Sequence, residues 1–206
     1  DNLRQVIASG GQILPWQNMI SVLRQHTLPC LNEHALLSRA ENLWGQARAM
    51  IGEIAHRAQA YRQLQVARKT RILREIGARL ISTFDVEGLM DLLAEGLPRL
   101  GIPSCYLALY EDPRPYKFPQ PAPEWSRLML AYNEYGRIDL EGKGQRFSTR
   151  QFVPKGLLPQ ERRVSFVVEP FYFQDEQIGF ALFEMGPREG AIYGALRAQI
   201  SSALQG

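Results

Sequence analysis

The chain has 206 residues, 45% hydrophobic and 22% charged, which is typical of a folded domain and excludes a disordered or collagen-like chain. No apolar run approaches the roughly 18 residues that a membrane-spanning helix needs, so we expect no membrane partner. The net charge is +3 with an excess of arginine, so a nucleic-acid partner has to be considered. Cys30 and Cys105 match no metal or redox spacing, which predicts reduced thiols in a cytoplasmic protein.

The positions of the histidines exclude several kinds of catalytic site. The chain contains His26, His34 and His56, and no histidine follows. The rest of the chain therefore lacks the base of a Ser-His-Asp or Cys-His nucleophile system. A histidine-based metal site is excluded there too, and one cysteine cannot form a thiolate zinc site. We therefore expect that the protein is not an enzyme and that it binds neither a metal ion nor a cofactor.

A long helix is predicted from Asn32, its expected N-cap, to about Phe84, because this stretch contains no proline. Its apolar residues recur mostly at spacings of three and four, with a slip in phase near Val66, as in the seam of a coiled coil. A helix this long cannot bury its seam on one small domain, so we expect a homodimer. The predicted dimerisation residues are Leu43, Ala47, Met50, Ile54, Tyr61, Leu64, Leu73, Ile76 and Leu80. The alternative is a break near Gly45 or Gly52 and a helical hairpin.

A basic cluster lies on the same helix, opposed within its interval only by Glu75. Its spacing would suit nucleic-acid binding, but Tyr61 is the only aromatic residue among the arginines, and no known DNA-binding spacing surrounds it. The solvated outer face of a coiled coil is the favoured interpretation. The cluster consists of Arg57, Arg62, Arg68, Lys69, Arg71, Arg74 and Arg79.

The next segment predicts a helix and the first strands of a sheet. Asp85 is the expected N-cap of a helix from Val86 to about Leu97. Strand-like alternation then separates two faces, one with Leu107 and Leu109 and the other with the intervening residues. The remaining elements are predicted as a strand at 105–110, a proline-rich loop at 112–123, strands at 128–132 and 137–140, and a loop at 142–161 with one helical turn.

The last third predicts a hairpin followed by a helix. A mostly buried strand at 164–173, a turn at 174–177 and a second strand at 178–185 are expected, with Gly179 where another backbone comes close. A helix at 188–205 follows, with its apolar residues at spacings of four. The fold class is α+β, an antiparallel sheet flanked by N- and C-terminal helices, with a long helical extension in front. Because the chain begins at Asp1 and the last helix runs to its end, we expect a segment of a longer protein.

Two segments of the chain resemble a GAF domain, a small α/β sensor module. LREIGARLISTFDVEGLMDLLAEGLPRLGIPSCYLALYE (73–111) resembles the opening helices and first strand of that family, and VVEPFYFQDEQIGFALFEM (167–185) resembles its closing hairpin. The resemblance covers about residues 70–206. It implies a helical coiled-coil extension at 1–67 and a GAF-like domain at 68–206.

The resemblance also implies a function. GAF domains are regulatory modules of bacterial signal-transduction and two-component proteins, where they dimerise through their helices and relay a signal. The expected partners are a second copy, attached sensor and output domains of the histidine kinase or diguanylate cyclase type, and a small-molecule ligand. Bilin and haem are not expected because the domain has no histidine, and the residues of a cyclic-nucleotide site are not assembled.

A ligand pocket, where the family has one, is expected on the sheet face away from the helices. The predicted binding residues are Tyr110, Tyr132, Arg150, Phe152 and Glu169. The alternative is that these side chains are rim or core packing. Leu107, Leu109, Val167 and Leu182 are predicted to be core. Two other functions stay open, a ligand-free dimerisation spacer and, less favoured, a nucleic-acid-binding regulator that uses the arginine-rich helix.

Overall fold

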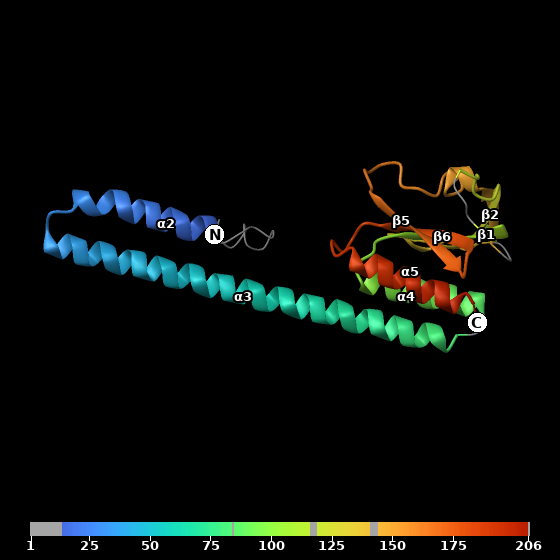
Figure 1. Cartoon of the computed structure of the whole chain (residues 1–206), viewed down its shortest axis with the longest axis horizontal. Helices are drawn as coiled ribbons and strands as arrows, with labels where there is room; N and C mark the ends of the chain where they lie inside the picture. Colours follow the sequence, from blue (N-terminus) through green and yellow to red (C-terminus); the bar gives the residue numbers. More distant parts are fainter. Residues whose placement is uncertain (1–13, 84, 116–118, 141–143, 206) are drawn as a thin grey trace. The chain divides into compact units, whose positions relative to one another are not determined.

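The computed structural model describes residues 14–83, 85–115, 119–140 and 144–205. The chain divides into two compact units, Asp1–Arg68 and Lys69–Gly206, next to the predicted boundary at 67/68. The fold is α+β, with a long N-terminal helix, a six-stranded antiparallel sheet and a C-terminal helix that packs on the sheet (Figure 1). The predicted fold class is therefore confirmed.

The first unit consists of helix α2 (Leu14–Thr27), the short 3-10 helix η1 (Leu28–Cys30) and most of helix α3 (His34–Ile81). Arg24 of α2 forms an ion pair with Glu41 of α3, with 2.7 Å between Nη2 and Oε1. Helix α3 is continuous through Gly45 and Gly52, so the alternative of a break and a helical hairpin does not apply. It begins at His34, one residue later than an Asn32 cap implies. Among the described residues of this unit, Ile51 is the only buried hydrophobic side chain.

The second unit is built on one sheet with the strand order β3-β2-β1-β6-β5, and β4 also pairs with β2. All of these pairings are antiparallel. A bulge in β2 places Met129 outside the regular register, because Leu107 pairs with Leu130 and Ala108 with Leu128. The strands are β1 (Cys105–Pro115), β2 (Trp125–Asn133), β3 (Gly136–Arg137), β4 (Gln145–Ser148), β5 (Phe166–Phe173) and β6 (Glu176–Glu184).

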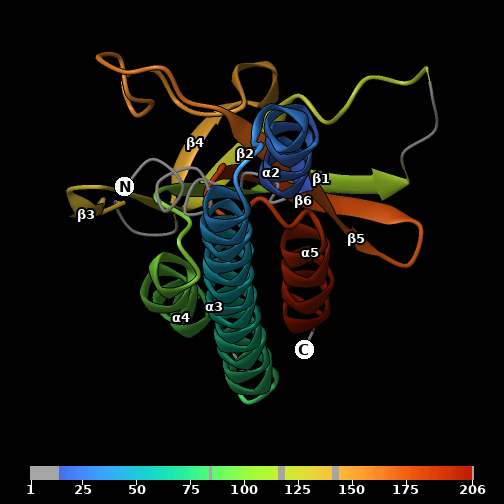
Figure 2. The same cartoon turned by 90° about the vertical axis from the view of Figure 1, so that its left-hand side faces the viewer.

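Three helical segments cover one face of this sheet. The C-terminal part of α3 lies between α4 (Val86–Arg99) and α5 (Ala191–Ala203), as Figure 2 shows. Glycines bring these helices close together, because a side chain at Gly96 would meet Ile76, and one at Gly77 would meet Gln199. Helix α4 begins as predicted, since the Asp85 carboxylate accepts a hydrogen bond from the Gly88 backbone N–H at 2.6 Å.

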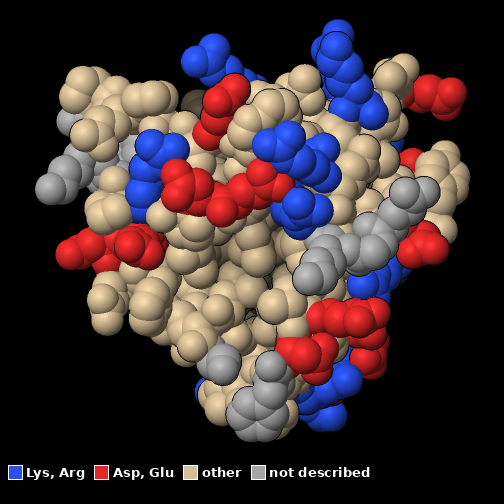
Figure 3. All heavy atoms as spheres, turned by 90° about the vertical axis from the view of Figure 1, so that its right-hand side faces the viewer, with Lys and Arg blue, Asp and Glu red and all other residues tan. Residues whose placement is uncertain are grey.

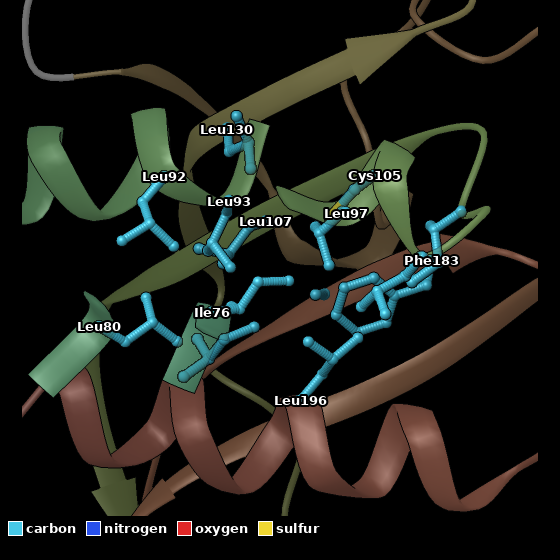
Figure 4. Packing of buried hydrophobic residues seen from close by; sticks show 14 of the residues in the cluster. Ile76, Leu80, Leu92, Leu93, Leu97, Cys105, Leu107, Leu130, Phe183 and Leu196 are labelled. Atoms are coloured by element: carbon cyan, nitrogen blue, oxygen red, sulfur yellow. The ribbon is translucent and has the colours of Figure 1, made fainter. Parts of the chain in front are cut away.

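The main hydrophobic core fills the space between these helices and the sheet. Ile76 and Leu80 of α3 meet leucines of α4, strand residues and Leu196 of α5 there (Figure 4). Both are almost fully buried within this chain, although the sequence predicted them as dimerisation residues. Leu107 is buried in this core, and Leu109 and Val167 pack against it, as expected.

A second apolar cluster covers the opposite face of the sheet, so the predicted alternation of β1 is confirmed. Leu182, also predicted as core, lies in this cluster and not in the main one. Its buried members are Tyr106, Ala108, Tyr110, Leu128, Ala131, Phe147, Val153, Phe180 and Leu182. The sheet is therefore covered by side chains on both faces.

Several predicted loop boundaries are wrong. Strand β1 continues into the proline-rich segment as far as Pro115, which pairs with Glu176 after a bulge. The 142–161 segment was predicted as loop with one helical turn; the 3-10 helix η2 (Thr149–Gln151) is such a turn, but strand β4 was not expected. Strand β5 is an edge strand with Val168 46% exposed, so it is less buried than predicted. The hairpin turn is only Gln174 and Asp175, and α5 is shorter than 188–205.

Candidate functional site

A cavity of about 790 Å³ lies on the sheet face opposite the helices. Strands β1, β5 and β6 supply its floor, and β4, η2 and the segment before β2 supply its rim. This volume is within the range of ordinary small-molecule sites. The lining residues are Tyr110, Arg114, Pro121, Ala122, Pro123, Glu124, Ser148, Thr149, Arg150, Phe152, Val168, Pro170, Gln177 and Phe180.

Three aromatic rings form the apolar part of this cavity. Phe180 is 3% exposed, and its ring centre lies 5.8 Å from that of Tyr110 and 5.9 Å from that of Phe152. The Phe152 ring meets Phe180 edge to face, at an interplanar angle of 79°. Gln177 Nε2 donates a hydrogen bond to the Tyr110 hydroxyl at 3.1 Å, which orients the phenol. Phe152 is 52% exposed, so its ring has surface available to a ligand.

The backbone at Phe152 is strained. Its φ of 60° and ψ of −37° are unusual for a bulky residue, and Val153 N–H donates to Gln151 O at 2.7 Å across it. This is close to a classic γ-turn, a rare and strained conformation. Hydrogen bonds from Thr149 N–H to Glu124 O at 3.0 Å and from Phe152 N–H to Thr149 O at 3.0 Å hold the turn in place. The strain is thus maintained at a residue of the cavity wall.

The charges around the cavity are unevenly matched. Arg114 forms an ion pair with Asp112, with 3.3 Å between Nη2 and Oδ2. Arg150 has no ion pair or hydrogen bond through its side chain in the described part of the chain. Glu124 is exposed and lines the same cavity. The site therefore offers one unmatched cation and one carboxylate.

The structure brings together three of the predicted binding residues, Tyr110, Arg150 and Phe152. Tyr132 lies on the other face of the sheet, where it is 3% exposed and its hydroxyl donates to Ile102 O at 2.9 Å. Burial raises the pKa of this phenol. Glu169 also lies on the helix side, with its Oε2 3.7 Å from Arg197 Nε of α5.

Two lining residues that the sequence analysis did not name are Phe180 and Gln177. Phe180 lies directly opposite Ala108 on the neighbouring strand β1. Ala108 alternates onto the same face of the sheet as Tyr110, so Phe180 faces the cavity as well. Gln177 was assigned to the turn, so its contact with the Tyr110 hydroxyl could not be anticipated. Ser148 was missed because β4 was read as loop.

A second cavity of about 590 Å³ lies between α4 and strands β2 and β3. Two arginines contribute to its wall, but both already have carboxylate partners. Arg137 pairs with Asp91, and Arg127 Nη2 lies 2.8 Å from Glu111 Oε1. Glu87 and Asp139 also line this cavity and form no ion pair in the described part of the chain, so its unmatched charges are acidic and none is a cation like Arg150.

A part-buried ion pair fixes the segment before β5 to the end of β6. Glu184 is 6% exposed and accepts hydrogen bonds from Arg162 Nη2 at 2.9 Å and from Ser104 Oγ at 2.8 Å. The Arg162 hydrogen bonds hold the pKa of Glu184 below its usual range. Both partners are used within the fold, so this cluster is structural.

The basic cluster of the long helix is partly neutralised. Lys69 Nζ lies 2.9 Å from Glu189 Oε2, Arg79 Nη1 lies 3.0 Å from Glu95 Oε2, and Arg57 pairs with Glu53. On the face of the sheet domain that Figure 3 shows, basic and acidic side chains are interspersed.

The residue types present limit what the 790 Å³ cavity could hold. No histidine or cysteine is among its described lining residues. The described ranges contain no group of three or more His, Cys, Asp or Glu side chains that could hold a metal ion. Cys105 is fully buried, and burial raises the pKa of its thiol.

Within the described residues, no helix has the length and apolar character needed to cross a membrane.

Comparisons with protein-family models, with curated proteins and with solved structures each found no match.

Proposed function

We propose that this chain is a GAF-like regulatory module of a larger bacterial signal-transduction protein. It binds a small molecule in the 790 Å³ cavity and passes the resulting change to its helices. It acts as a homodimer and relays the signal to an attached output domain. It is not an enzyme.

The observation that carries this proposal is the position of strand β5 between the cavity and helix α5. Val168 and Pro170 line the cavity, whereas Glu169 between them pairs with Arg197 of α5. Further along β5, Tyr172 N–H donates to Ser201 Oγ of α5 at 3.4 Å. One short strand thus touches both the ligand site and the helix. Because β5 is an edge strand with a single neighbour in the sheet, a shift of β5 would disturb strand pairing on one side only.

The first unit supports the homodimer. Its described part buries one hydrophobic side chain, which is too little to stabilise a long helix without a partner. The apolar residues of α3 recur at coiled-coil spacing, so a second copy of the same helix fits them best. Within the first unit, the large ones that are more than 60% exposed are Leu43, Met50, Tyr61 and Leu64.

A thermal-shift screen of the full chain tests this function. With a panel of nucleotides, amino acids and aromatic acids, at least one compound is expected to raise Tm in proportion to its occupancy. The shift should be lost in Val168→Trp, which fills the cavity, and kept in Val86→Trp, a similarly exposed valine that lines the other cavity.

The alternative functions predict other outcomes. If no compound shifts Tm in the wild-type chain, the ligand-free dimerisation spacer becomes the better account. Tight DNA or RNA binding that weakens steeply with added salt would favour the nucleic-acid regulator.

A further inference from the structure

We propose that the cavity on the sheet face opposite the helices takes a planar aromatic anion, such as an aromatic carboxylate. This inference rests on the proposed function and assigns a ligand class to its site. It combines the shape of the apolar wall with Arg150, a cation at the rim that has no partner among the described residues.

The wall of the cavity is suited to a flat ring. Phe180 is a buried floor residue, and the half-exposed ring of Phe152 stands edge to face against it. Proline rings at Pro121, Pro123 and Pro170 supply further flat apolar surface. A planar aromatic ligand covers such surfaces well and gains favourable offset or edge-to-face contacts with the rings. An unbranched or globular aliphatic molecule would lose these contacts.

The strain at Phe152 supports the same conclusion. An exposed phenylalanine in a γ-turn conformation is unfavourable both for its backbone and for its hydration. A glycine would adopt this turn without strain. A ligand that covers the ring would offset the second cost, because it removes the exposed apolar surface from water.

The charge of the ligand follows from Arg150. Its guanidinium has no partner in the described part of the chain, whereas Arg114 at the same cavity is paired with Asp112. A planar carboxylate fits a guanidinium through two parallel hydrogen bonds. Glu124 on the same wall would repel the anion, so the anionic end of the ligand is expected to lie toward Arg150 and away from Glu124.

The test compares two probes of nearly the same shape, 1-naphthoate and its neutral amide 1-naphthamide. Isothermal titration with the full chain is expected to give tighter binding of the acid, by about fivefold or more. Arg150→Gln should remove this preference, and Glu124→Gln should increase it. Phe152→Leu should weaken both probes. Arg163→Gln, which changes an exposed arginine outside the cavity, should leave both affinities unchanged.

Two results would overturn the inference. Equal affinities for acid and amide, unaffected by Arg150→Gln, would show a neutral aromatic site and leave the proposed function standing. Binding of neither probe would also reject this ligand class. In that case the thermal-shift screen decides separately whether the proposed function fails, because it includes ligands of other classes.

Discussion

Glu184 is a buried carboxylate whose charge is matched by Arg162 and whose second contact is the Ser104 hydroxyl. Replacing it by glutamine keeps the shape but removes the charge-assisted hydrogen bonds. We expect Glu184→Gln to lower the free energy of unfolding at pH 7 by about 2 kcal/mol. Urea unfolding measures this loss, with the exposed Glu161→Gln as a control that should change little.

The effect of Glu184→Gln depends on pH. Because Arg162 lowers the folded-state pKa of Glu184, the carboxylate stabilises the fold above its unfolded pKa, about 4.3. This contribution is lost as the pH falls through the lower folded-state pKa. The difference between wild type and variant should therefore be full at pH 7 and shrink below pH 4. A difference that stays constant down to pH 3 would contradict the role of the charge.

Substitutions of Phe152 measure the backbone strain at the cavity wall. Alanine and glycine both remove the ring, but only glycine adopts a positive φ without strain. Phe152→Gly is expected to be more stable than Phe152→Ala by about 1 kcal/mol, although glycine usually destabilises a folded chain. Thermal or urea unfolding of the two variants measures the difference in their stability. An alanine variant of higher stability would show that the turn relaxes.

At this scale the sequence predicted part of the site. Tyr110, Arg150 and Phe152 line the cavity as expected, because aromatic and charged side chains near strand ends are common in binding sites. Tyr132 was placed on the wrong face because of the bulge at Met129. Without that bulge Tyr132 would share a face with Leu128, which does face the cavity side. Nothing in the local sequence marks the bulge.

At the scale of elements, β6 and β1 are held together at a point where only glycine fits. A side chain at Gly179 would come within 2.3 Å of Ala108 O in the neighbouring strand, as the sequence prediction of a close backbone approach required. Since the obstacle is backbone, Gly179→Ala should destabilise the protein by about 2 kcal/mol.

Gly194 in α5 is the matched control for this substitution. A side chain there would meet nothing within 4 Å, so Gly194→Ala should raise stability by about 0.5 to 1 kcal/mol through helix propensity. Chemical unfolding of both variants is the measurement. Opposite signs are expected, and destabilisation by both would contradict the packing described for α5.

The elements themselves were largely predictable, and the failures have a common cause. Long periodic helices and the capping Asp85 carry local signals, so α3, α4 and α5 were found. The end of β1 and all of β4 carry weak strand propensity, and pairing with distant strands stabilises them. Pro115 is tolerated because β1 pairs there only with β6, so its other edge needs no N–H donor.

At the scale of the whole molecule, the proposed self-association through α3 can be tested by mutation. Although the basic cluster as a whole is interpreted as an outer face, seam spacing places one of its members, Arg57, between Ile54 and Tyr61, where an apolar residue would be expected. Leu64→Glu should therefore weaken the dimer, and Arg57→Leu should strengthen it, each by about tenfold or more. Analytical ultracentrifugation measures this against a monomer of 23.4 kDa.

A surface variant provides the control for the dimer. Gln59→Glu changes an exposed residue outside the predicted seam and should leave the association constant unchanged. A wild-type chain that stays at 23.4 kDa at all concentrations would remove the homodimer from the proposal. The cavity and its ligand would still have to be judged by their own tests.

In the proposed function, a ligand in the cavity changes helix α5 through strand β5. Hydrogen–deuterium exchange of the full chain, with and without the compound that gives the largest thermal shift, measures this change. We expect slower exchange at the cavity wall around 148–153, together with altered exchange in β5 and in α5 (Ala191–Ala203). Protection confined to the cavity wall, with unchanged exchange in β5 and α5, would contradict it.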